Sequence, residues 1–285
     1  MKTKTVLFAL ALTLVFTSCV RAQQSQQYDS EGDFLYEIRD GKVIITEYVG
    51  TKQEICIPPQ IRRTPVTEIG KEAFSKMYIT SVTIPNSVTT IGENAFTNNQ
   101  LTSVVIPDRV TAIGNYAFAG NRLTSVIIPD RVTIIEAGTF GANRLTSVVI
   151  PNSVTAIGDD AFGGNHLTSV TIPDSVTSIG EYAFSYNRLT SVSIGNGVTT
   201  IGKRAFAENR LTSVTIPNSV TLIGQNVFDV IFSDGSRISN PPTSITIGAN
   251  VIFPDTSRDS FAQSYNAQGR RAGTYTISNN RWSLN

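Results

Sequence analysis

Two residue types recur every 22 positions along most of the chain, and this period constrains the fold more than any other feature of the sequence. Phenylalanine takes the same place in successive units, at positions 74, 96, 118, 140, 162, 184, 206 and 228. Proline keeps the same period at 85, 107, 129, 151, 173 and 217, with Gly195 in the missing place. A unit this short cannot bury its apolar side alone, whereas stacked units share one continuous core. The sequence therefore predicts a solenoid.

Most positions in the unit that begins at Leu101 have a physical explanation. Leu101, Val104 and Ile106 alternate with other residues, which predicts a short strand with its apolar side inward. The proline that follows cannot donate a ladder hydrogen bond and ends that strand. Gly114 is predicted to allow a tight turn, and Asn121 to close a short helical turn in the left-handed conformation. The phenylalanine of each unit is the large filler of the predicted core.

The segment 123–132 reads LTSVIIPDRV. It matches the first three apolar positions of the leucine-rich repeat signature L-x-x-L-x-L-x-x-N/C-x-L, although Arg131 stands at the usual Asn or Cys position. The piece VTAIG at 154–158 and the Ala-Phe pair after it resemble the BspA-type bacterial leucine-rich repeat subfamily. This resemblance implies an α/β fold, a leucine-rich-repeat solenoid with short parallel strands on one face and short helical turns on the other. It also implies a cap at each end.

Departures from the period define the expected divisions of the chain. The regular array is expected over residues 67–232. Residues 28–66 resemble the capping segment of the same subfamily, because Ile55–Pro58 aligns with Val82–Pro85 across a short insertion. Residues 233–285 are expected to hold an irregular repeat and a C-terminal cap. Such caps are needed because the last unit of a solenoid would otherwise expose its core.

Residues 1–18 have the features of a secretory signal peptide. Lys2 and Lys4 precede an apolar run from Val6 to Phe16, and two small residues follow. The run is shorter than the roughly 20 residues that a membrane-spanning helix needs. The segment therefore predicts export of the chain and removal of its first residues.

The residues before Cys19 resemble a bacterial lipobox, in which the cysteine is acylated and becomes the new N-terminus. Phe16 departs from that motif, which prefers leucine there. Ordinary signal peptidase cleavage before Gln23 is the alternative. Residues 19–27 are polar and are interpreted as a flexible spacer. We therefore expect a lipid-anchored protein of the outer membrane or cell surface, or else a secreted or periplasmic one.

Composition narrows the chemistry of the chain. The 23 Lys and Arg against 22 Asp and Glu give a formal net charge of +1, which excludes a protein built around polyanion binding, because phosphate neutralisation needs a basic excess. One histidine, His166, and two cysteines, Cys19 and Cys56, are too few for a zinc site. A serine triad would have to use His166 as its base. We predict no catalytic residue, no metal site and no cofactor.

One column of the repeat is a row of basic side chains, which we call the cation stripe. It consists of Arg122, Arg144, His166, Arg188 and Arg210. Neighbouring strands lie about 4.8 Å apart, so these charges repel one another unless anions intervene. Two explanations remain open: pairing with acids of the chain, or a site for an anionic ligand. The candidate acids are Asp108, Asp130, Asp159, Asp160, Glu181 and Glu208.

Two other columns are predicted to face solvent on the inner surface of the solenoid. One is serine in every unit, and the other includes Val105, Ile127 and Val149, which we call the apolar strip. Contiguous exposed apolar surface indicates a protein partner, whereas β-propensity alone also favours these residue types in strands. The predicted partner-binding residues are Ser103, Val105, Ser125, Ile127, Ser147, Val149, Ser169 and Thr171.

The resemblance to BspA-type proteins implies a non-catalytic, surface-exposed binding or adhesion protein that contacts host, matrix or bacterial proteins. An extended curved face suits such contacts because many weak sites act together. A structural or assembly component of the bacterial cell envelope is the alternative. The expected ligand is a protein and not a nucleic acid, and the expected contact with a membrane is limited to the N-terminal lipid.

Overall fold

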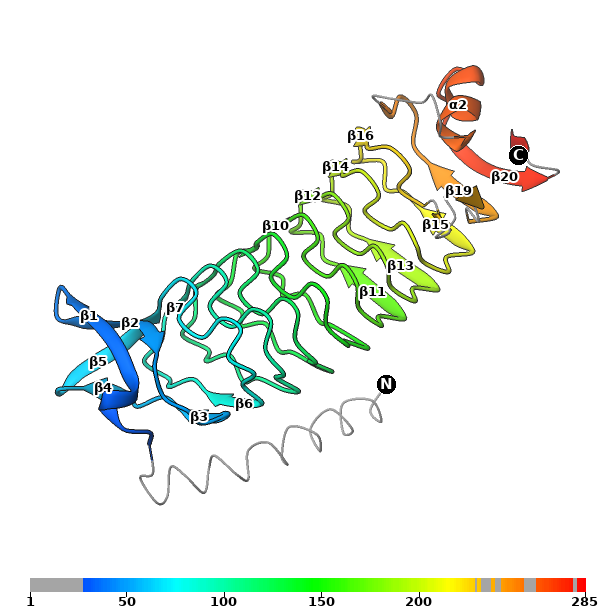
Figure 1. The fold of residues 1–285 in the computed structure, drawn as a ribbon. Helices are drawn as coiled ribbons and strands as arrows, with labels where there is room; N and C mark the ends of the chain where they lie inside the picture. Colours follow the sequence, from blue (N-terminus) through cyan, green and yellow to red (C-terminus); the bar gives the residue numbers. More distant parts are fainter. Residues whose placement is uncertain (1–27, 229, 232–236, 239–241, 254–259, 279–280) are drawn as a thin grey trace, which may run out of the picture.

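The computed structural model describes residues 28–228, 230–231, 237–238, 242–253, 260–278 and 281–285. Figure 1 shows an elongated array of stacked coils, with a β-rich N-terminal end and a C-terminal end that carries the helix α2 (Ser260–Ala267). The predicted solenoid is therefore confirmed. The predicted signal peptide, the lipid attachment residue Cys19 and the spacer lie outside the described residues.

The N-terminal end extends the array by a β-hairpin. Its elements are η1 (Glu31–Asp33), β1 (Phe34–Arg39), β2 (Lys42–Tyr48), β4 (Gln60–Ile61) and β5 (Thr64–Ile69). Strand β2 pairs antiparallel with β1 and parallel with β5, so the hairpin continues the ladder of the coils. The rings of Phe34 and Tyr48 lie 6.4 and 5.7 Å from the ring of Phe74, the first repeated phenylalanine. They cover the ring at this end of the Phe row.

One side of each coil, which we call the strand face, begins at the repeated leucine. Its strands are β3 (Glu54–Cys56), β6 (Ser81–Thr83), β11 (Ser169–Ile172), β13 (Ser191–Ile194), β15 (Ser213–Thr215) and β19 (Ser244–Ile247). Parallel pairs form between β3 and β6, β11 and β13, and β15 and β19. The sequence predicted such strands in every coil. In the three central coils, however, segments 103–106, 125–128 and 147–150 form no backbone ladder with one another.

The second side, the ladder face, carries a two-residue strand in each coil. These strands are β7 (Thr90–Ile91), β8 (Ala112–Ile113), β9 (Ile134–Ile135), β10 (Ala156–Ile157), β12 (Ser178–Ile179), β14 (Thr200–Ile201) and β16 (Leu222–Ile223). They pair in parallel from β5 through β7 to β8, and again from β9 to β16. Within the described residues the ladder is interrupted only between β8 and β9, in the coil where Glu136 replaces the repeated glycine.

Glycine is required at the repeated position directly after the ladder-face strand, which is Gly114 in its coil, because neighbouring coils approach closely there. A Cβ on Gly114 would lie 2.5 Å from the backbone nitrogen of Glu93, which belongs to the preceding coil. The predicted tight turn does begin at Gly114, whose carbonyl accepts a hydrogen bond from the Ala117 N–H at 3.2 Å, and the close approach of the coils is a second reason for the glycine. Glu136 carries the side chain that this spacing excludes, which explains why its coil does not pair with the preceding one.

The third side, the turn side, differs from the expected helical turns. Among the described residues, helix occurs only in η1 and α2, both outside the regular coils. Each turn instead donates backbone hydrogen bonds to the next coil, for example from Phe118 to Thr139 at 3.0 Å. Left-handed residues at Tyr116 (φ 56°) and Gly120 (φ 65°) interrupt any helix there. The predicted helical turns are therefore not confirmed in the described coils.

Asn121 also has a different role from the left-handed cap that we expected. Its side chain is buried, and its Oδ1 accepts a hydrogen bond from the Leu101 N–H at 3.1 Å. Its Nδ2 donates to the carbonyls of Phe96 at 2.9 Å and Phe118 at 3.1 Å. The same arrangement recurs at Asn99, Asn143, Asn165, Asn187 and Asn209. The asparagine column thus satisfies buried backbone groups that the turns leave without partners.

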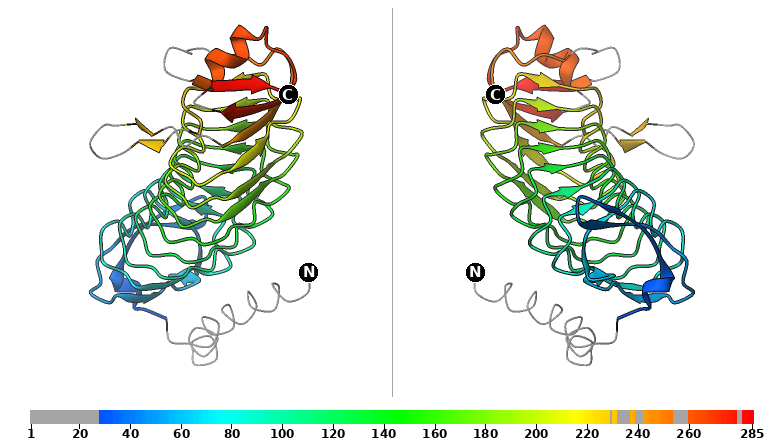
Figure 2. Two further views of the ribbon diagram at one scale, coloured as in Figure 1. Left: turned by 90° about the vertical axis from the view of Figure 1, so that its right-hand side faces the viewer. Right: turned by 90° about the vertical axis from the view of Figure 1, so that its left-hand side faces the viewer.

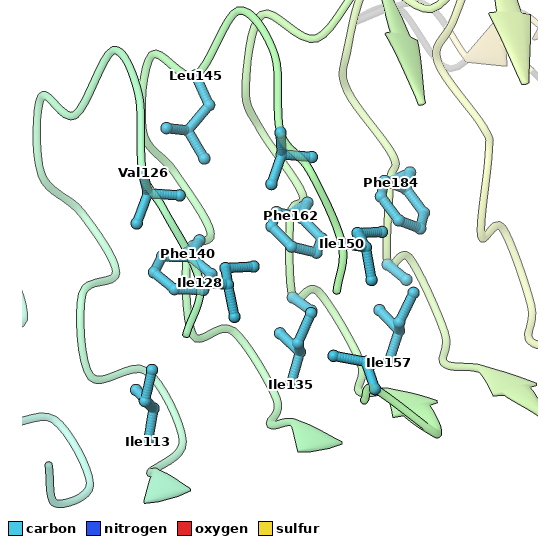
Figure 3. Packing of buried hydrophobic residues seen from close by; sticks show 14 of the residues in the cluster. Ile113, Val126, Ile128, Ile135, Phe140, Leu145, Ile150, Ile157, Phe162 and Phe184 are labelled. Atoms are coloured by element: carbon cyan, nitrogen blue, oxygen red, sulfur yellow. The ribbon is translucent and has the colours of Figure 1, made fainter. Parts of the chain in front are cut away.

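The core is a stack of phenylalanines lined by aliphatic side chains. Ring centroids from Phe74 to Phe228 are 5.0 to 6.2 Å apart in successive coils, and the rings are nearly parallel. Figure 3 shows Phe140, Phe162 and Phe184 in this row, beside the isoleucines of the two strand-bearing sides. The predicted core residues of the repeat are confirmed as buried.

After the regular coils the chain forms a hairpin and a mixed sheet. The elements are β17 (Val230–Ile231), β18 (Arg237–Ile238), β20 (Gly273–Ser278) and β21 (Arg281–Leu284). Figure 2 shows the β17–β18 hairpin projecting from the side of the array. Strands β20 and β21 continue antiparallel from β19, and α2 packs Phe261 against Trp282, with ring centroids 5.0 Å apart. Tyr265 fixes this end by donating to the Gly248 carbonyl at 2.8 Å.

Candidate functional site

The apolar strip forms one row on the strand face. Val105, Ile127 and Val149 are 44%, 50% and 75% exposed at the same position of three successive coils. Val104 and Ile106 on either side of the first member are buried, as an extended segment requires. Single exposed aliphatic side chains are ordinary on a protein surface, but three in register make a continuous patch.

Polar residues surround the strip. The predicted serines Ser103, Ser125 and Ser147 are half-buried beside it, and Ser169 and Thr171 are exposed in the next coil. At the corner between the strand face and the ladder face, the exposed charged residues are Asp108, Arg109, Asp130 and Arg131. The cation stripe runs along the opposite corner. The strip is therefore an apolar centre between two polar margins, which is the composition of many protein interfaces.

The open backbone under the strip is the feature that sequence reasoning missed. Segments 103–106, 125–128 and 147–150 are joined by core packing and not by a ladder. Backbone bonds join these coils on the other two sides and at the start of the strand face, where the N–H of Thr124 donates to the carbonyl of Thr102 at 3.3 Å. Alternation of residue types fixes which side chains point outward, but it carries no information on the distance between coils.

The cation stripe is held in place by an unbroken row of backbone hydrogen bonds. The N–H of Arg122 donates to the carbonyl of Leu101 at 2.9 Å, and the N–H of Arg144 donates to Leu123 at the same distance. The bonds of His166, Arg188 and Arg210 repeat this pattern. The four arginines are exposed, and His166 is half-buried.

Pairing with a described acid is not observed for Arg122, Arg144 and Arg188. None of these three arginines takes part in the ion pairs Arg39–Glu37, Lys52–Asp29 and Lys71–Glu93, which lie before the stripe. For these three arginines the structure therefore does not support pairing with the chain's own acids. The second explanation, a site for an anionic ligand, stays a hypothesis.

Three acids cluster on the turn side. Burial raises the pKa of Asp160, and the negative charges of Asp159 and Glu181 raise it further. The Oδ1 of Asp159 accepts a hydrogen bond from the Glu181 N–H at 2.7 Å. Within the described part of the chain, however, no group of three His, Cys, Asp or Glu side chains is placed to hold a metal ion.

Comparison with known families identifies the repeat. The family described as BspA type Leucine rich repeat region (6 copies) matches residues 60–168, 111–233 and 155–258, which together cover more than half of the chain. The chain belongs to the BspA-type leucine-rich repeat family. The resemblance in the repeated segments is thereby confirmed.

Solved structures of leucine-rich repeat proteins are similar to this BspA-type chain. The T. pallidum leucine-rich repeat protein is 28% identical with a TM-score of 0.57, and the match covers 65% of this chain and 91% of that one. A leucine-rich cell surface protein of Faecalibacterium prausnitzii is 29% identical with a TM-score of 0.49, over 90% of this chain and 60% of that one. A search of curated proteins found no match.

No helix in the described part of the chain is both long and apolar enough to cross a bilayer.

Proposed function

We propose that this BspA-type protein is a non-catalytic binding protein that docks a partner protein on its strand face. The observation that carries the proposal is the apolar strip, because it exposes three aliphatic side chains in register beside uncharged serines. Burying such a patch under a partner removes apolar surface from water. The family supports a role in protein interaction, since stacked repeats present extended surfaces of this kind.

The proposed location is the outside of a bacterial cell, with the chain anchored by a lipid on Cys19. The basis is the signal-peptide pattern and the lipobox-like residues before that cysteine. A partner could then belong to the host, to the extracellular matrix or to another bacterium. A role as a structural component of the envelope would require the partner to come from the bacterium itself.

Site-specific photo-cross-linking distinguishes these partners. A photoreactive residue would replace Ile127 in one variant and Ile134 in a control variant. The two side chains are similarly exposed, at 50% for Ile127 on the strand face and 44% for Ile134 on the ladder face. Each variant is mixed with extracellular host proteins or with cell-envelope extract. We expect one partner to be captured from Ile127 and not from Ile134. Equal capture from both positions would contradict docking on the strand face.

A further inference from the structure

The cation stripe is part of a longer column that begins with Tyr78 and Gln100 and continues to Arg210. An N–H to carbonyl bond of 2.8 to 2.9 Å joins each position, from Gln100 onward, to the coil before it. The spacing of the coils that carry the stripe follows from the core, where successive ring centroids from Phe118 to Phe206 are 5.3 to 5.8 Å apart. The stripe therefore presents one basic side chain about every 5 Å. The row is roughly 20 Å long.

From Arg122 to Arg188 the residues beside the stripe offer no opposite charge to its arginines. On its turn-side flank the small residues Gly120, Ala142 and Gly164 stand two positions before successive stripe residues. On its other flank every coil carries Leu-Thr-Ser, in which the leucine is buried and the threonine is exposed. From Arg122 to Arg188 these flanking positions hold no acid. An extended anion can therefore approach the arginines closely, and exposed hydroxyls stand beside it.

We propose that the cation stripe binds a linear anionic polysaccharide laid along the axis of the array. Guanidinium groups bind carboxylate or sulfate with two parallel hydrogen bonds, and the threonine hydroxyls can donate to or accept from sugar hydroxyls. The near-neutral net charge excludes a surface that binds polyanions over the whole protein. It does not exclude a local site, because the basic residues of the stripe are gathered in one row. This site is separate from the apolar strip and does not depend on the protein partner.

Exposed aromatic residues favour a sugar over a peptide. Tyr186 is 56% exposed and lies two residues before Arg188, and Tyr78, 66% exposed, heads the column. The apolar faces of pyranose rings pack on such aromatic surfaces. Along an extended peptide, side chains on one face recur about every 6.7 Å and fall out of step with one cation per coil. A linear pyranose chain advances by roughly one ring length per sugar, which is comparable with the coil spacing.

The energetics require several charges to act together. A single exposed ion pair contributes little because water and salt screen it. Binding should therefore depend strongly on the length of the sugar chain and on ionic strength. A chain shorter than the stripe would contact fewer arginines and bind more weakly.

The test is the affinity of the full-length protein for polygalacturonate and dextran sulfate, with neutral dextran and poly-glutamate as comparison polymers. The variant Arg144→Ala/Arg188→Ala removes two stripe charges. The matched control Arg109→Ala/Arg131→Ala removes two exposed arginines from the opposite corner of the strand face. We expect the stripe variant to bind the anionic sugars about tenfold or more weakly, and the control to stay within about twofold of wild type.

Tyr186→Ala separates a sugar from a peptide ligand. It should weaken polysaccharide binding about threefold or more and leave poly-glutamate binding unchanged. Equal losses in the stripe variant and its control, or no binding even at low salt, would overturn the proposal. Poly-glutamate binding that is tighter than sugar binding and insensitive to Tyr186 would assign the stripe to acidic peptides instead. Should the alanine variant not fold, Arg144→Lys/Arg188→Lys keeps the charge and should still weaken binding by removing the bidentate contact.

Discussion

Replacing Phe140 with alanine tests whether the phenylalanine row holds the array together. Phe140 is 1% exposed and lies between the rings of Phe118 at 5.8 Å and Phe162 at 5.7 Å. Truncation of a buried phenylalanine costs about 3–5 kcal/mol, because transfer energy is lost and a cavity remains. For a domain of about 200 residues, each kcal/mol lowers Tm by about 2–4 °C. We therefore expect Phe140→Ala to lower Tm by at least about 6 °C.

Thermal unfolding followed by circular dichroism measures this change. The control is Arg144→Ala, which replaces an exposed residue four positions after Phe140. It should change the free energy of unfolding by no more than about 0.5 kcal/mol. Phe228→Ala should cost less than Phe140→Ala, because Phe228 is only partly buried and its nearest ring in the row is 6.2 Å away. A Phe140→Ala protein that melts within a degree or two of wild type would refute the assigned repeat register.

Three further predictions concern the asparagine column, the acid cluster and the N-terminus. Asn143→Ala leaves the buried N–H of Leu123 without a partner, whereas the carbonyls of Phe118 and Phe140 keep bonds from Asn121 and Asn165; it should therefore lower the free energy of unfolding by about 1–3 kcal/mol and speed amide exchange at Leu123. The pKa of Asp160 is raised in the folded protein, so its ionised form destabilises the fold at neutral pH. Asp160→Asn should therefore raise Tm at pH 7. This gain should disappear in acid, where the carboxyl of the wild-type protein is already neutral. Intact mass of the native protein should show a lipid-sized increment on Cys19, whereas a soluble chain that begins at Gln23 would disprove the anchor.

Much of the fold followed from the sequence because the 22-residue period fixes phase. Once Phe118 is assigned to the core, the inward positions Val104 and Ile106 and the outward position Val105 follow, and the burial of these three residues agrees. The exposed row of the candidate site was predictable for the same reason. Phase determines which way a side chain points within its coil.

Contacts between coils were not predictable in the same way. The hydrogen-bond partners of Asn121 include Phe96 in the preceding coil, so one repeat read alone suggests a local cap instead. The turn after Gly114 was expected to be helical by resemblance, but left-handed Tyr116 and Gly120 interrupt it. The missing backbone ladder beneath the apolar strip depends on the spacing between coils, which no single unit encodes.

The most direct test of the proposed function is the affinity of Ile127→Glu for the protein captured at the strand face. Glutamate at this position would place a charge in a desolvated contact, and the fold should survive because the side chain points outward. We expect a loss of about 2 kcal/mol or more, roughly 30-fold in Kd. Ile134→Glu, on the ladder face, should bind like wild type. Unchanged affinity in Ile127→Glu, together with impaired binding in Arg144→Ala/Arg188→Ala, would contradict docking on the apolar strip and place the partner on the cation stripe.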